Sequence, residues 1–170
     1  MNPESISIRP LEPMDEPILW MMLYLAIHVP PGEPNPPLNI IFRPELARYA
    51  RDWGQPGDSG FVAFDAENLP IGAVWLRLLT GDHRGYGWVS DQVPELSIAV
   101  VPEYRGMGIG TQLLHKAIQL AEERFPAVSL SVSPGNPAAD LYRRLGFVEV
   151  LQSGASLTMI RKNLRSTNLR

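Results

Sequence analysis

The stretch VPEYRGMGIGTQLL, residues Val101–Leu114, decides the fold of this chain. It places three glycines within five residues: Gly106, Gly108 and Gly110. Apolar residues at helical spacing follow and predict a helix over residues 109–124. The first turn of a helix leaves backbone N–H groups unpaired at the positive end of its dipole, and glycine lets a ligand approach them closely. The stretch therefore predicts a phosphate or pyrophosphate site at a strand-to-helix turn, to which Arg105 adds a fixed positive charge.

The familiar phosphate-binding glycine loops do not match this stretch. A P-loop needs a lysine after its last glycine, but Thr111 follows Gly110. The dinucleotide fingerprint needs a third glycine at position 111, where that threonine stands. A kinase glycine loop lies between two strands and is followed by a lysine on the second strand, which also does not fit. The glycines alone leave open a second interpretation, in which residues 106–110 form only a tight turn.

The rest of the chain predicts one mixed α/β domain over residues 1–170, without internal repeats. Alternating apolar residues predict strands, and helical periodicity with capping residues predicts helices. The predicted strands cover residues 6–9, 61–64, 71–79, 95–101, 128–132, 147–151 and 156–160, and the predicted helices cover residues 15–28, 44–53, 109–124 and 137–145. This order predicts helices on both faces of a largely antiparallel sheet. Five prolines among residues 29–37 predict a stiff loop.

Composition excludes several classes of protein. The chain has a net charge of -3 and a sequence pI of about 5.6, which argues against a nucleic-acid-binding face. It has no cysteine, so thiolate nucleophiles and cysteine-ligated metals are excluded, and its three histidines are too scattered to predict a metal site. The start lacks the regions of a signal peptide, and the apolar segment 18–29 is too short to cross a bilayer. A cytoplasmic protein without a nucleic-acid or membrane partner is predicted.

Three segments carry a resemblance to a known family. The pattern R-x-x-G-x-G, formed by Arg105, Gly108 and Gly110, lies within ELSIAVVPEYRGMGIGTQLL, residues 95–114. The other two segments are VSLSVSPGNPAADLYRRLGFVEV, residues 128–150, and ISIRPLEPMDEPILW, residues 6–20. Together they resemble the GCN5-related N-acetyltransferases, the GNAT family. The resemblance implies a mixed, largely antiparallel central sheet with helices on both faces and acyl-CoA in a cleft between splayed central strands.

The resemblance also implies which residues bind acetyl-CoA, with no metal. In the family the loop amides wrap the cofactor's pyrophosphate, which implies contacts from Arg105, Gly106, Met107, Gly108, Ile109, Gly110 and Thr111. The preceding strand pairs its backbone with the pantetheine arm, which implies contacts from Ile98, Ala99 and Val100. Asn136 is implied as a further cofactor contact, and a plain helix N-cap is the alternative interpretation of this residue.

Two side chains are candidate catalytic residues, Tyr142 and Glu95. Tyr142 occupies the position of the family's general acid, where a phenol hands a proton to the departing thiolate; a core aromatic is the alternative. Glu95 begins the cofactor-binding strand, where the family often places an acidic residue, and is implied as the base that deprotonates the acceptor amine. A solvated carboxylate at a strand end is the alternative interpretation of Glu95. Asp91 and His83, in the preceding loop, are weaker candidates for the base.

The implied activity is direct, acetyl-CoA-dependent N-acetylation of a primary amine of a small molecule or peptide. Two alternatives stay open: a non-catalytic acyl-CoA-binding or sensor protein of the same fold, and an O-acetyltransferase. In the family the first helix, the proline-rich loop 29–37 and the loop 81–93 surround the acceptor side, and variable residues there choose the acceptor. A second copy of the chain, forming a homodimer through a sheet edge, is the candidate protein partner.

Overall fold

Seven strands form one mixed sheet in the protein. The structure, a computed structural model, describes residues 5–164, so residues 1–4 and 165–170 of the predicted domain lie outside the described part. The strands follow the order β1-β2-β3-β4-β5-β7-β6, and every neighbouring pair is antiparallel except β4 with β5. Their bounds are β1 Ser7–Pro10, β2 Ser59–Phe64, β3 Pro70–Arg77, β4 Glu95–Val100, β5 Ala127–Val132, β6 Val148–Ser153 and β7 Ser156–Lys162. The largely antiparallel sheet confirms the predicted fold class.

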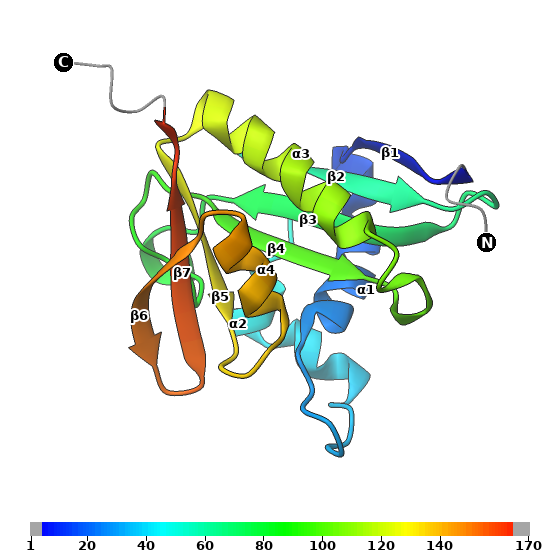
Figure 1. The fold of residues 1–170 in the computed structure, drawn as a ribbon, viewed down its shortest axis with the longest axis horizontal. Coiled ribbons are helices and arrows are strands. Elements are labelled where there is room, and N and C mark those ends of the chain that lie inside the picture. The colour runs from blue at the N-terminus through cyan, green and yellow to red at the C-terminus, as the bar shows by residue number, and fades with distance from the viewer. Residues whose placement is uncertain (1–4, 165–170) are drawn as a thin grey trace.

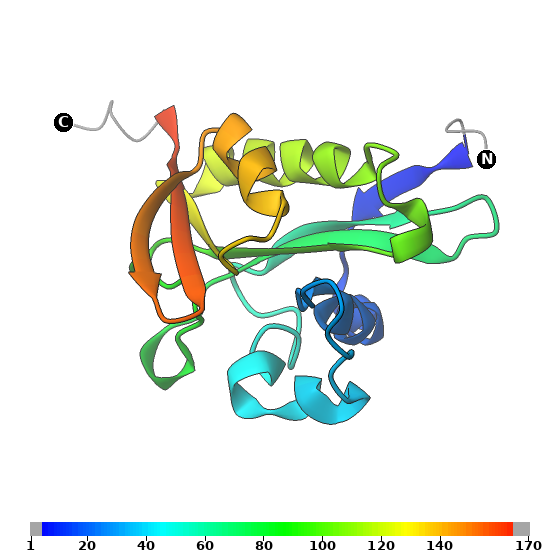
Figure 2. The same cartoon turned by 60° about the horizontal axis from the view of Figure 1, so that its bottom comes forward.

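Helices cover both faces of this sheet, as the order of elements predicted (Figure 2). On one face lie α3 (Ile109–Arg124) and α4 (Ala138–Arg144), and on the other lie α1 (Glu16–Ala26) and α2 (Pro44–Ala47). The described residues also form four short 3-10 helices: η2 (Pro13–Asp15), η3 (Leu38–Phe42), η4 (Gly81–His83) and η5 (Pro102–Tyr104). Among residues 5–164, no helix is long and apolar enough to span a membrane.

Two apolar cores fill the space between the sheet and these two layers. Successive residues of a strand point to opposite faces, so one strand supplies side chains to both cores. Leu96 of β4 packs in the core beneath α3 and α4, while Ala99 packs in the core beneath α1. In β3, Leu76 packs in the core beneath α3 and α4, and Trp75 packs in the core beneath α1. This burial on both faces explains why the central strands are apolar almost throughout.

The two parallel strands, β4 and β5, diverge almost at once. Their register contains a single pair, Glu95 with Ser129, beside a hydrogen bond of 3.0 Å from the Ser129 N–H to the Pro94 carbonyl oxygen. From there β5 turns away from β4, as Figure 1 shows. On its other edge β5 is paired with β7 along its whole length. The sheet therefore has the splayed central strands that the resemblance implied.

The structure corrects two of the predicted elements on the α1 face. The predicted helix over 44–53 is regular only in α2, because the Arg48 carbonyl oxygen, which a continuing helix would bond to the Asp52 N–H, binds the side chain of Arg77. The helix predicted over 15–28 begins after η2 and ends at Ala26. Sequence analysis also gave no element for η3. In the two predicted helices, a contact or a turn decides the local structure against weak helical periodicity.

Candidate active site

The glycine-rich segment forms the turn between β4 and α3, as predicted (Figure 1). The first helical hydrogen bond of α3 runs from the Gln112 N–H to the Gly108 carbonyl oxygen, at 3.1 Å. The N–H groups of Ile109, Gly110 and Thr111 precede it and have no backbone acceptor among the described residues. Three backbone donors are therefore available at the positive end of the helix dipole, where an anion is stabilised.

Two of the three glycines are needed for their backbone conformation. Gly106 and Gly108 have φ values of 76° and 82°, in the left-handed region that residues with a Cβ rarely adopt. A Cβ built on either glycine would meet no heavy atom within 4 Å, so the protein leaves space beside this backbone. A Cβ on Gly110 would make an ordinary contact of 3.7 Å with Val100. Open space against left-handed glycines fits a cofactor phosphate lying close to the main chain.

Arg105 follows η5 and directly precedes these glycines. Its side chain is exposed, and its Nε donates a hydrogen bond of 2.9 Å to the Val100 carbonyl oxygen. This bond uses one guanidinium N–H and fixes the side chain beside the strand end. The remaining N–H groups have no acceptor within the described part of the chain and stay available for an anion.

Backbone groups of β4 alternate between β3 and the gap beside β5. The Val101 N–H donates to the carbonyl oxygen of Ile71, in β3, at 2.8 Å, and the continuous register gives Ala99 the same direction. The N–H and C=O groups of Ile98 and Val100 consequently point toward β5, and of these groups the Val100 carbonyl oxygen already accepts the bond from Arg105. Of the three strand positions implied for pantetheine, Ile98 and Val100 therefore face the gap between β4 and β5, whereas Ala99 faces β3.

Asn136 lies just before the helix α4, and Tyr142 lies within that helix. The Asn136 Oδ1 accepts the Ala138 N–H at 3.0 Å, so this side chain caps the helix, and its amide N–H groups have no partner among residues 5–164. Tyr142 is buried, with its ring centroid 5.9 Å from that of Phe147. Burial raises the pKa of Tyr142 to about 12. Within the described part of the chain its hydroxyl has no hydrogen-bond partner, and its role as an acid stays a prediction.

Glu95 is not the solvated carboxylate that sequence analysis kept as an alternative, because its side chain is buried with 3% of its surface exposed. Its Oε1 accepts hydrogen bonds from the Tyr49 hydroxyl at 2.6 Å and from the Gly87 N–H at 2.8 Å. Its Oε2 is buried and has no partner among the described residues. Burial raises the pKa of Glu95, although the bonds from Tyr49 and Gly87 and the charge of Arg48 oppose that rise. A raised pKa makes a carboxylate a better proton acceptor.

The weaker candidates for the base lie apart from Glu95. Asp91 and His83 are both exposed, and Asp91 accepts a hydrogen bond of 3.0 Å from the Trp88 indole. No hydrogen bond joins either residue to Glu95 or Tyr142 within residues 5–164. In the same part of the chain, no three His, Asp or Glu side chains gather into a group that could hold a metal ion.

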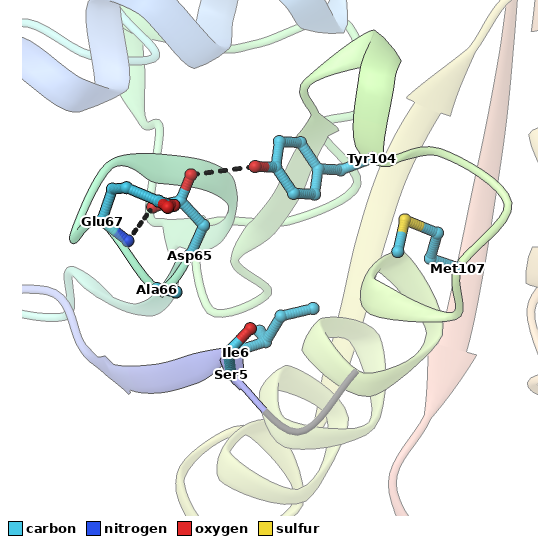
Figure 3. A pocket seen from close by; sticks show the side chains of 7 residues that line it. All are labelled: Ser5, Ile6, Asp65, Ala66, Glu67, Tyr104 and Met107. Atoms are coloured by element: carbon cyan, nitrogen blue, oxygen red, sulfur yellow. Dashed lines mark hydrogen bonds between the residues drawn. The ribbon is translucent and has the colours of Figure 1, made fainter. Parts of the chain in front are cut away.

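Two cavities lie near these groups. One, of about 110 Å³, borders the glycine turn and is lined by Ser5, Ile6, Asp65, Ala66, Glu67, Tyr104 and Met107 (Figure 3). The Tyr104 hydroxyl donates to Asp65 there at 2.9 Å, so the turn after β2 anchors the residue before Arg105. The other cavity, of about 150 Å³, is lined by Glu45, Arg48, Arg84, Gly85 and Tyr86. Its wall at Gly85 separates it from Glu95.

A model of the acetyltransferase (GNAT) family matches residues 26–147, which include β4, the glycine turn, α3 and α4. The chain belongs to this family. Among curated GNAT relatives, mycothiol acetyltransferase of Pseudarthrobacter chlorophenolicus is 32% identical over 151 residues, which are 85% of this chain and 43% of that protein. Streptothricin acetyltransferase A of Bacillus subtilis is 33% identical over 116 residues, covering 67% of this chain and 59% of that protein.

The chain therefore spans about half the length of the curated GNAT relatives it matches. Solved structures share its fold along nearly the whole chain. The PaiA N-acetyltransferase of Thermoplasma acidophilum, solved with coenzyme A, has a TM-score of 0.65 at 21% identity, covering 93% of this chain and 99% of that one. The GNAT protein of Kribbella flavida has a TM-score of 0.64 at 21% identity, covering 95% of this chain and 99% of that one.

Sequence analysis missed the residues that surround the Glu95 carboxylate: Tyr49, Gly85 and Gly87. Tyr49 precedes Glu95 by 46 residues, and its hydroxyl reaches Glu95 only through the folded sheet. The one local signal was the spacing of two glycines around Tyr86, which indicates a backbone held close to other atoms. That spacing does not indicate which atoms are approached.

Proposed function

We propose that this chain carries an acetyl-CoA-dependent N-acetyltransferase that transfers an acetyl group directly to a primary amine of a small molecule or peptide. The divergence of β4 from β5 beside the glycine turn carries the proposal. It leaves the backbone groups of Ile98 and Val100 without a neighbouring strand, close in sequence to the open left-handed glycines. An extended pantetheine arm needs free strand backbone and a pyrophosphate needs free helix amides, and here the two lie in succession.

The cofactor would be held mainly by main-chain groups. The amides from Gly106 to Thr111 would bind the pyrophosphate, with Arg105 adding charge, and the amide group of Asn136 would make a further contact. Ile98 and Val100 would pair with the pantetheine arm, and one of their own N–H groups, which both face the gap beside β5, would stabilise negative charge on the acetyl oxygen. When bound, acetyl-CoA supplies an acetyl thioester that is open to attack by an amine.

Tyr142 is proposed as the group that donates a proton to the thiolate. Its pKa of about 12 keeps the phenol protonated at physiological pH. Because its hydroxyl has no partner among the described residues, its proton is not committed to another group. The contact with Phe147 fixes the ring, so the direction in which the hydroxyl points is set by the core.

Glu95 is proposed as the group that takes the proton of the amine. The free oxygen Oε2 is the acceptor in this proposal, because Oε1 already holds two hydrogen bonds. Oε2 lies under Gly85, since a Cβ on that residue would come within 2.1 Å of it. The proton must therefore travel past the Gly85 backbone, through a small shift of the loop or along a water.

The acceptor is proposed only as a primary amine. Relatives at similar identity are named for different substrates, mycothiol and streptothricin among them. An O-acetyltransferase would prefer hydroxyl acceptors over amine acceptors in one panel. A non-catalytic acyl-CoA-binding protein would bind CoA but would release no thiol with either class of acceptor. Cytoplasmic location and homodimer formation stay predictions.

The cofactor is tested by calorimetric titration with acetyl-CoA and CoA, using ATP and NAD as controls. We expect micromolar, selective binding of acetyl-CoA, and we expect Gly108→Trp to abolish it because the indole fills the space beside the turn. Release of free thiol with an amine panel then tests the transfer, with no background because the chain has no cysteine.

The matched control is Gly154→Trp, in the turn between β6 and β7. Gly154 also has a positive φ, and a Cβ there also meets nothing within 4 Å, so the backbone strain of the two substitutions is comparable. This variant is expected to keep its affinity for acetyl-CoA. Absence of CoA binding by the unmodified chain, or preferred binding of ATP or NAD, would refute the proposed function.

A further inference from the structure

We propose that Tyr49 is a positioning residue for the transfer reaction, because its hydroxyl holds Glu95 and the loop 81–93 together and so leaves Oε2 as the oxygen that accepts the amine's proton. The inference rests on the proposed function, and it adds a residue that neither the motifs nor the family match assigns. Tyr49 does not itself contact the reacting atoms in this proposal; it acts through Glu95.

Tyr49 is anchored to the sheet at both its main chain and its side chain. Its carbonyl oxygen accepts a hydrogen bond of 2.9 Å from the Trp75 indole of β3. Arg77, also of β3, donates to the carbonyl oxygens of Arg48 at 3.0 Å and Arg51 at 2.6 Å, on either side of Tyr49. The segment that carries Tyr49 is therefore fixed to β3, although it is not a regular helix.

The Tyr49 hydroxyl links two elements that are distant in sequence. It donates to Glu95 Oε1 at 2.6 Å and accepts the Tyr86 N–H at 2.8 Å. Gly87, two residues after Gly85 in the same loop, donates its own N–H to Glu95 Oε1 at 2.8 Å. One oxygen of the carboxylate thus has two donors, and the other has none among the described residues. This asymmetry decides which oxygen is free to take a proton.

Two glycines bring the loop backbone directly onto the carboxylate and onto β5. A Cβ on Gly85 would lie 2.1 Å from Glu95 Oε2 and 2.4 Å from the Tyr49 hydroxyl. A Cβ on Gly87 would lie 2.7 Å from the Leu130 carbonyl carbon. The loop can occupy this position only because both residues lack a side chain, and Tyr49 fixes its distance from the sheet.

The groups that set the titration of Glu95 come from each neighbouring element. Tyr49 and Arg48 follow α2, Gly87 belongs to the loop, and the cross-strand neighbour on β3 is Arg77, whose guanidinium is paired with Asp58. On β5 the neighbour is the uncharged Ser129. The ionisable groups of α1 are engaged elsewhere: Glu16 binds Trp20 and Trp53, and Tyr24 binds Pro36.

Tyr49→Phe removes the hydroxyl and keeps the ring. The bond from Tyr49 lowers the pKa of Glu95, which burial has raised, so its loss raises that pKa further. A base acts in its deprotonated form, so the acid limb of the rate profile should move to higher pH. On the acidic side of that limb the rate should fall about tenfold for each pH unit of displacement.

The test is a carboxyl NMR titration of the full chain labelled with 13C at the glutamate carboxyl carbon, with the Glu95 signal identified by its absence in Glu95→Gln. We expect a higher midpoint in Tyr49→Phe than in the unmodified chain. Tyr24→Phe, which removes a hydroxyl bonded at 2.8 Å to Pro36 on the same side of the sheet, should leave the midpoint unchanged. An unchanged or lower midpoint in Tyr49→Phe would overturn the proposal.

A second variant, Gly85→Ala, tests the same contact from the loop. Its methyl group must lift the loop from Oε2 and admit water. Because burial is the largest cause of the raised pKa of Glu95, its relief should outweigh the loss of the Gly87 bond, and the Glu95 midpoint should move down, opposite to Tyr49→Phe. This variant decides the question if Tyr49→Phe does not fold, because a midpoint that stays in place contradicts the close fit of the loop.

Rates separate this inference from the proposed function. With the best amine of the panel, the acid limb of thiol release should follow the NMR midpoint in both variants. If the midpoint shifts while an active enzyme keeps its acid limb, Tyr49 does not act through Glu95 in the reaction, and the acetyltransferase proposal stands. If no amine supports thiol release in the unmodified chain although CoA binds, the proposed transfer fails and this inference fails with it.

Discussion

Tyr142 combines a core position with an uncommitted hydroxyl. Its ring belongs to the apolar core beneath α3 and α4, and burial is the cause of its raised pKa of about 12. A group that donates a proton must hold that proton at working pH, and a raised pKa ensures this. The raised pKa also makes the free energy of unfolding depend on pH. The contribution of Tyr142 to that free energy is fully present below the ordinary phenol pKa, near 10, and it is lost as pH rises through about 12.

Replacing Tyr142 by phenylalanine should separate catalysis from binding. Because the ring and its contact with Phe147 remain, we expect an unchanged Kd for acetyl-CoA and a kcat about 100-fold lower, the usual effect of losing a positioned acid. Calorimetry and steady-state thiol release measure the two quantities. Met159→Leu is the control, since it alters the same apolar core but keeps the Tyr142 hydroxyl and its contact with Phe147, and it should retain kcat. A full kcat in Tyr142→Phe would remove this residue from the mechanism.

At the scale of single residues, the sequence predicted those features whose physical cause lies in neighbouring residues of the chain. The left-handed backbone of Gly106 and Gly108 follows from a turn that must lead directly into a helix, so the glycine spacing predicted it. The burial of Glu95 could not be predicted, because a carboxylate at the start of a strand looks solvated in sequence. Its enclosure comes from Tyr49 and Gly87, which reach it only in the folded chain.

At the scale of elements, Arg77 connects β3 to the irregular segment after α2. Its guanidinium pairs with Asp58 at 3.1 Å, and its Nη groups bind the carbonyl oxygens of three residues: Arg48, Arg51 and Asp52. The Arg77 and Asp58 side chains are only 7% and 4% exposed, so neither charge is screened by water. This cluster stabilises the segment that positions Tyr49.

Arg77→Met should destabilise the fold strongly. Removing one partner of a buried ion pair leaves the other charge unpaired, and we expect a loss of about 3 kcal/mol in the free energy of unfolding, measured by urea denaturation. The double variant Arg77→Met with Asp58→Leu should recover part of that loss, because no buried charge remains. Arg143→Met, which breaks half-exposed ion pairs on α4, should have a much smaller effect. Equal losses in the two single variants would contradict the importance of the buried cluster.

The elements that were predicted well have local start and stop signals. The bounds of α3 match the prediction at both ends, because its apolar stripe is regular and glycines precede it. Residues 44–53 carry a similar periodicity, but Arg77 binds the Arg48 carbonyl oxygen, which a continuing helix would bond to the Asp52 N–H. A contact with a residue of another strand has no signature in the local sequence, so the end of α2 could not be predicted.

At the scale of the whole molecule, the order of elements predicted a largely antiparallel sheet covered on both faces, and the structure confirms it (Figure 2). The divergence of β4 and β5 was known only from the resemblance, because strand pairing between distant segments is not encoded in either strand alone. The outer strand β6 has all six residues exposed. It is one of the two sheet edges at which the predicted homodimer would form, the other being β1.

The splayed sheet also predicts which backbone amides respond to the cofactor. The Ala99 N–H points to β3 and is protected by that strand, whereas the N–H groups of Ile98 and Val100 point into the gap beside β5. Without cofactor, the amides of Ile98 and Val100 should exchange their hydrogens much faster than that of Ala99. Saturating CoA should slow the exchange of those two amides and leave Ala99 nearly unchanged, because an extended pantetheine arm takes the place of the missing strand.

Residue-resolved hydrogen exchange by NMR, with and without CoA, measures this pattern. Gly108→Trp with the same concentration of CoA is the control, and its exchange rates should resemble those of the free chain. Protection of Ala99 instead of its two neighbours would mean that the register of β4 does not direct the cofactor. If CoA binds but protects none of these three amides, the pantetheine arm lies outside the gap between β4 and β5. The proposed active site would then lose its structural basis.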